Sequence, residues 1–183
     1  MTQSTYAPMM PSASRHGFFL GFALVVMQSI FYLADINIDS ILGILLSFII
    51  LCGGLFLSAR QYRDELNSGF ISYGRLVGYS VVVSLMAGII SSTFVFVLYQ
   101  YIDVTLIEKM LYETETAFEK MNRPPEETEM AMKFYEDFLV TPIGLSIKEI
   151  LKCVFNGTLF SLVIAVFLKK EDEGFNSFNK DTI

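Results

Sequence analysis

Residues 76–102 read LVGYSVVVSLMAGIISSTFVFVLYQYI, a run of 27 residues without a charged side chain. A bilayer core of about 30 Å is crossed by roughly 20 apolar residues in helical conformation. Backbone groups in hydrocarbon need internal hydrogen bonds, so a run of this kind is expected to be an α-helix. The stretch therefore predicts a transmembrane span.

Three further runs have the length and character of spans. Residues 17–34 and 40–59 carry no charge, and residues 143–168 are apolar except for three charges near their start. Together with residues 76–102 they predict an all-α fold, a four-helix transmembrane bundle. Residues 15–170 form this membrane domain. The polar segments 1–14 and 171–183 are expected to be disordered tails.

The overall composition agrees with a membrane protein. Hydrophobic residues make up 53% of the chain and charged residues 17%, whereas soluble domains carry about 25% charged residues. The spans contain no Ser/His or paired-aspartate arrangement, and the chain has no phosphate loop, no zinc motif and no cofactor fingerprint. The single histidine, His16, has no Cys or His neighbours. We therefore expect a protein that is not an enzyme and has no cofactor or metal.

Lysine and arginine predict the orientation. Seven of them fall on the side of the N-terminus, the loop after the second span and the C-terminal tail, and those nearest the membrane lie almost wholly there. Under the positive-inside rule, both termini are expected in the cytoplasm.

The segment between the third and fourth spans, residues 103–141, has a net charge of −6 and its own helical pattern. Apolar residues recur at helical spacing on both sides of Pro124 and Pro125, which predicts a helical hairpin outside the cytoplasm. The hairpin either packs on itself or on lipid, or it docks a partner. Its acidity argues against nucleic-acid binding.

Small residues recur four apart in every span, as in Gly17-xxx-Gly21. Such residues let helix backbones approach closely, within one bundle or between copies of the chain. The predicted packing positions in spans three and four are Gly74, Gly78, Ser84, Gly88, Ser92, Gly157 and Ser161.

Polar residues inside the spans are the candidates for function. Lys148, Lys152 and Asn156 share a helix face, Glu149 can reach Lys152, and Gln28 lies in the first span. The charges either lie at the headgroup level or form an ion or proton path through the bilayer. Asn156 lies deeper and fits an interhelical hydrogen bond.

The loop after the second span contains a group of predicted membrane anchors. Arginines suit anionic headgroups, tyrosines suit the interface, and the aspartate neutralises an arginine. These residues are Arg60, Tyr62, Arg63, Asp64 and Tyr73. Asn67-Ser68-Gly69 predicts a turn.

Several of these stretches also carry a family resemblance. They are Tyr62-Arg63-Asp64, Gly69-Phe70-Ile71-Ser72-Tyr73-Gly74, Tyr101-Ile102-Asp103, the acidic insert with Pro142, and Lys169-Lys170. In them the chain resembles the bacterial membrane proteins of domain of unknown function 4199, found mainly in Bacteroidetes. The resemblance covers about residues 15–171 and implies a four-span inner-membrane protein, without an activity or site residues.

These observations leave two main function classes. The first is an interaction or structural component of the membrane, a small subunit that contacts the lipid bilayer and either another membrane protein or further copies of itself. The alternative is a small oligomeric transporter or channel that uses the polar line on the fourth span.

Overall fold

The structure is a computed structural model that describes residues 8–38, 40–65, 69–120 and 125–170. Its helices are α1 (Met9–Leu33), α2 (Ile41–Asp64), α3 (Tyr73–Val97), α4 (Thr105–Lys120), α5 (Pro125–Phe134) and α6 (Pro142–Leu168). Two π-helical turns, η1 (Leu98–Ile102) and η2 (Tyr135–Leu139), extend α3 and α5. Apart from one isolated bridge between Ile71 and Lys170, the described residues form no β structure.

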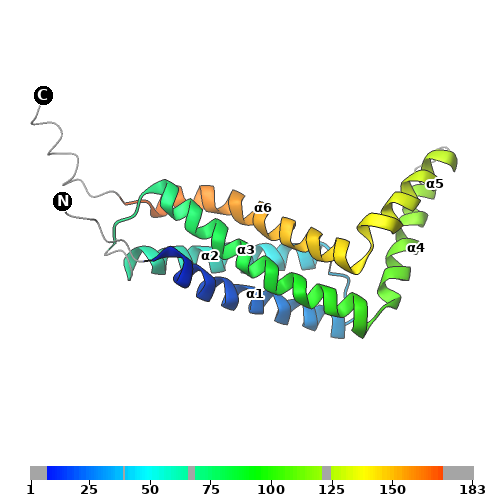
Figure 1. The fold of residues 1–183 in the computed structure, drawn as a ribbon, viewed down its shortest axis with the longest axis horizontal. Helices are drawn as coiled ribbons and strands as arrows, with labels where there is room; N and C mark the ends of the chain where they lie inside the picture. The colour runs from blue at the N-terminus through cyan, green and yellow to red at the C-terminus, as the bar shows by residue number, and fades with distance from the viewer. Residues whose placement is uncertain (1–7, 39, 66–68, 121–124, 171–183) are drawn as a thin grey trace, which may run out of the picture.

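The predicted all-α bundle is confirmed. Four helices are long and apolar enough to cross a membrane, namely α1, α2, α6 and α3 with η1. They lie side by side along the long axis of the molecule, while α4 and α5 project from one end (Figure 1). We call this the hairpin end; α1 and α3 end there, and α2 and α6 begin there.

Helix α3 is the centre of the bundle, with its most extensive contacts to α1 and α6. Small residues make both contacts possible. A Cβ atom on Gly21 of α1 would lie 2.9 Å from the carbonyl oxygen of Ala87, and a Cβ atom on Gly88 of α3 would lie 3.1 Å from the Cβ atom of Cys153. Gly157 of α6 lies directly against Ser84. The helices therefore pack closely within one chain.

Two predicted packing positions are wrong. A Cβ atom on Gly74 or Gly78 would meet no atom within 4 Å. Both glycines lie near the start of α3, on a side that faces no other helix closely. The remaining predicted positions in α3 and α6 are buried: Ser84, Gly88, Ser92, Gly157 and Ser161.

The start of α1 also differs from the prediction. The helix begins at Met9, so residues 9–14 are helical rather than disordered. Pro11 is tolerated because it lies in the first turn, where its missing N–H has no intrahelical partner. Ala13 is fully buried in the core, and Ser12 lies 3.3 Å from the Tyr79 hydroxyl. Residues 1–7, the tail 171–183 and the predicted turn residues Asn67 and Ser68 lie outside the described residues.

Helix α2 continues to Asp64, so the predicted anchor residues up to Asp64 belong to a helix rather than to a loop. Asp64 does pair with both arginines, at 3.5 Å from Arg60 and 2.6 Å from Arg63. Arg63 also donates to the carbonyl oxygen of Leu168, at 3.2 Å, and so caps the end of α6. Tyr73 donates to a carbonyl of the same helix.

Candidate functional site

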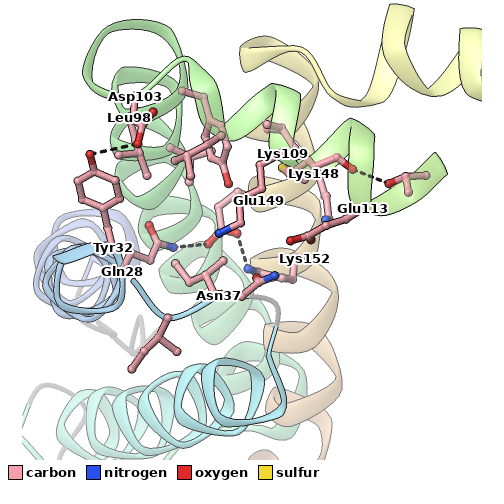
Figure 2. Close-up of a pocket in the computed structure, with 18 of the residues that line it drawn as sticks. Gln28, Tyr32, Asn37, Leu98, Asp103, Lys109, Glu113, Lys148, Glu149 and Lys152 are labelled. Carbon is pink, nitrogen blue, oxygen red and sulfur yellow. Dashed lines mark hydrogen bonds and ion pairs between the residues drawn. The ribbon is translucent and has the colours of Figure 1, made fainter. Parts of the chain in front are cut away.

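A cavity of about 530 Å³ lies at the hairpin end, between the bundle and the hairpin (Figure 2). Its walls come from α1, the α1–α2 turn, α3, η1, α4, η2 and α6. Apolar residues of the α4 stripe predicted from the sequence face it, including Leu106, Met110 and Phe118. The charged residues that line it are Asp35, Asp103, Lys109, Glu113, Lys148, Glu149 and Lys152.

Glu149 is the most buried of the charged residues that line this site. The residue is only 7% exposed, although it is charged and lies on an apolar helix. Its Oε1 accepts hydrogen bonds from the Ser91 hydroxyl at 2.8 Å and from the Gln28 amide at 3.0 Å. Its Oε2 forms an ion pair with Lys152, one turn further along α6. The buried charge is therefore both paired and hydrogen-bonded, as burial in a low-dielectric interior demands.

Gln28 connects this network to α1. It is 3% exposed, and its Nε2 also donates to the Ser91 hydroxyl at 2.9 Å. Figure 2 shows the amide with its nitrogen toward Glu149 and its oxygen turned away. That oxygen is buried and accepts no hydrogen bond from the described residues. An unsatisfied buried acceptor costs about 1–3 kcal/mol, so this atom marks a place where a donor is missing.

The network lies some distance inside the ends of the helices that carry it. Glu149 follows the start of α6 by seven residues, or about 10 Å of helix, and Gln28 precedes the end of α1 by five, or about 8 Å. Glu149 faces the bundle interior rather than the outer surface of the bundle. A carboxylate in that position is the kind of intramembrane group that marks a functional site.

The structure thus brings together four of the five predicted polar residues: Gln28, Lys148, Glu149 and Lys152 all line the cavity. Asn156, the fifth, lines a smaller adjoining cavity of about 60 Å³ that shares Glu149 and Lys152 with the first. Sequence analysis missed Ser91. The one signal available in the sequence was that Ser91 belongs to a pair of adjacent serines in the third span, at a depth that matches Gln28 and Glu149.

Three contacts that the sequence did not predict lie at the mouth of the cavity. The Tyr32 hydroxyl donates to Asp103 at 3.4 Å. The Thr105 hydroxyl also donates to Asp103, at 2.6 Å, and lowers the pKa of that carboxyl. Lys109 of the hairpin lies 3.9 Å from Asp35 of the α1–α2 turn. Both partners are exposed, so this ion pair holds the hairpin only weakly.

A second polar cluster lies at the opposite end of the bundle. His16 contacts the Tyr79 hydroxyl at 2.5 Å through Nδ1 and the Gln61 side-chain oxygen at 2.8 Å through Nε2. Tyr62 stacks on Tyr79 with ring centroids 4.0 Å apart and is fully buried. Tyr62 is therefore a core residue that joins α2 to α3, and its prediction as a membrane anchor is wrong. Neither cavity reaches this cluster.

Within the part of the chain that the structure describes, no group of three or more His, Cys, Asp or Glu residues could hold a metal ion. The side chains that line the cavity carry carboxylates, amines and an amide.

No curated protein and no solved structure matches the chain. A family model matches residues 15–170, which include most of α1, the whole of α2, α3 and α6, the hairpin and every residue of the Glu149 network. Its extent agrees with the resemblance seen in the sequence. The chain therefore belongs to the family described as Protein of unknown function (DUF4199).

Proposed function

We propose that this multi-pass membrane protein binds a small polar solute in the cavity at the hairpin end, as the binding site of a small transporter or channel. The observation that carries the proposal is the Glu149 network. It places a charged pair and an amide on the wall of a cavity that lies partly below the ends of the membrane helices, with the Ser91 hydroxyl bonded to the carboxylate. The cavity volume falls within the range of about 300–1,000 Å³ that is typical of small-molecule sites.

We further propose that the protein lies in the bacterial inner membrane with both termini in the cytoplasm. The distribution of Lys and Arg supports this orientation, and the family resemblance supports the inner membrane. The cavity then opens to the outside of the cytoplasm. On this proposal the protein captures a solute without chemically converting it.

Retention of a native solute tests the proposal. We expect that wild-type protein extracted into lipid nanodiscs carries a small molecule, which mass spectrometry detects after denaturation. Ala117→Trp fills the cavity from α4 and should remove that molecule. Tyr112→Trp is the matched control, because Tyr112 lies on the same helix, is 71% exposed and does not line the cavity. Equal amounts of every small molecule in wild type and Ala117→Trp would contradict the proposal.

A second candidate function is that of a subunit in a larger complex, with another membrane protein or a second copy of the chain as its partner. The observation in its favour is a group of exposed apolar side chains on α5 and η2, namely Met130, Phe134 and Phe138. The same nanodisc preparation distinguishes the two candidates. A stoichiometric protein partner, with no solute retained, would favour the subunit.

A further inference from the structure

We propose that the solute is a zwitterion with an apolar body, of the chemical class of a dipeptide with apolar side chains. This inference rests on the proposed function and adds the identity of the ligand class. It follows from how charges of both signs, one unsatisfied acceptor and apolar side chains are distributed around the cavity.

The cavity wall carries both signs of charge. Three lysines and four carboxylates line it; Lys152 pairs with Glu149 one turn away on α6, and Lys109 of α4 pairs with Asp35 of the α1–α2 turn. A ligand with one net charge would find groups of its own sign among those that it must approach. A ligand that carries both charges can pair its cation with a carboxylate and its anion with a lysine. These pairs compensate for the free energy lost when water leaves the charged groups of the ligand and of the cavity.

The ammonium group of such a ligand fits the inner part of the cavity. Glu149 and Gln28 meet there, and both offer acceptors. The Gln28 Oε1 atom lacks a donor among the described residues. A carboxylate oxygen accepts two hydrogen bonds, and Lys152 is the described donor to Glu149 Oε2, which leaves room for one more. Rotation of the Gln28 amide would turn Oε1 toward a ligand N–H beside Glu149, in exchange for the Nε2 hydrogen bonds to Ser91 and Glu149.

The ligand carboxylate fits the outer part, where lysines from two elements face the cavity. Lys148 lies one helical turn, or about 6 Å, closer to the start of α6 than Lys152. Lys109 reaches in from α4, and its exposed ion pair with Asp35 is weak enough to rearrange. A fully extended dipeptide spans at most about 7 Å, which is comparable to the rise along α6 between Lys152 and Lys148.

The remaining wall selects for an apolar body. Between the charged groups the cavity presents Leu98, Leu106, Met110, Phe118 and Leu145. Burial of apolar side chains there is favourable by about 25 cal/mol per Å². A polyhydroxylated solute of equal size would leave its hydroxyl groups without partners at this wall.

Three probes that share one body test the inference: L-leucyl-L-leucine, its N-acetyl derivative and its C-terminal amide. Binding to the full chain in nanodiscs is measured by equilibrium dialysis. We expect saturable binding of the dipeptide at one site per chain, and at least tenfold weaker binding of each derivative, which is about 1.4 kcal/mol. Binding of either derivative as tight as that of the dipeptide would overturn the inference.

Two variants assign the charges to residues. Lys148→Gln should lower the affinity for the dipeptide to that for its C-terminal amide, because the lysine that pairs with the ligand carboxylate is lost. Glu149→Gln should remove the discrimination against the N-acetyl derivative. Lys148 is exposed, so its variant remains a test even where Glu149→Gln fails to fold. Lys120→Gln, an exposed lysine of α4 that does not line the cavity, should change nothing. An unchanged preference for the dipeptide in Lys148→Gln would contradict the inference.

The outcomes separate this inference from the function on which it rests. Binding of a derivative as tight as that of the dipeptide, and abolished by Ala117→Trp, would refute the zwitterion and leave the solute site standing. Absence of binding by all three probes would refute the dipeptide class. Loss of a retained native solute in Ala117→Trp would still support the site.

Discussion

Replacing Lys152 by methionine should lower the free energy of unfolding by about 2–3 kcal/mol. The substitution leaves the Glu149 carboxylate buried without its cation, and breaking a buried ion pair from one side costs about 3–5 kcal/mol. We expect a loss at or below the lower end of this range, because the Lys152 side chain is 39% exposed and water in the cavity weakens its attraction to Glu149. Denaturant titration of the purified protein in mixed micelles measures the loss.

The double variant Glu149→Gln with Lys152→Met is the control for this result. It removes both charges while glutamine keeps polar atoms near Gln28 and Ser91, so it should recover most of the lost stability. A cost below about 0.5 kcal/mol for Lys152→Met, within the range of surface substitutions, would show that the pair is not held in a low-dielectric site.

Replacing Gly157 by leucine should destabilise the bundle by about 3 kcal/mol or more. A Cβ atom at this position would already overlap the side chain of Ser84, which is fully buried on α3. Forcing extra carbons into a packed interior typically costs about 1–3 kcal/mol, and here the contact is between two helices that cannot separate without opening the core. The same micelle titration measures the effect.

Gly78→Leu provides the matched comparison, since a Cβ atom on Gly78 meets no atom within 4 Å. We expect this variant to stay within about 0.5 kcal/mol of wild type. Equal losses for the two variants would mean that α3 and α6 are not held at the distance seen here.

Much of the fold could be predicted from the sequence, because hydrophobic length alone identifies a span. Four uncharged or nearly uncharged runs became four helices, and the insert with its Pro124-Pro125 break became α4 and α5. The start of α1 could not be predicted in this way. Ser12 and Ala13 look like tail residues until Tyr79 of α3 is placed beside them.

For the candidate site, the sequence predicted only which residues of the same helix lie together. Helical spacing showed that Lys148, Glu149 and Lys152 belong together, but not what faces them. Gln28 and Ser91 are separated from Glu149 by 121 and 58 residues, and their meeting depends on how α1 and α3 are rotated. Rotation is set by close contacts such as Gly21 with Ala87, which a single sequence does not reveal. For the same reason Tyr62 was predicted at the surface.

Cysteine labelling in intact cells tests most directly whether a water-filled cavity lies within the membrane domain and opens away from the cytoplasm. The measurement uses a chain in which Cys52 and Cys153 are replaced by alanine. A membrane-impermeant maleimide should label Lys148→Cys, which lines the cavity, but not the adjacent Ile147→Cys, which is exposed on the outer surface of the bundle and would face lipid.

Ser72→Cys, at the opposite end of the bundle, should be labelled only after the cells are permeabilised. This pattern would support the cavity, its depth and the orientation together. Labelling of Ser72→Cys from outside would reverse the orientation. Equal labelling, or equal protection, of Lys148→Cys and Ile147→Cys would contradict the cavity on which the proposed function depends.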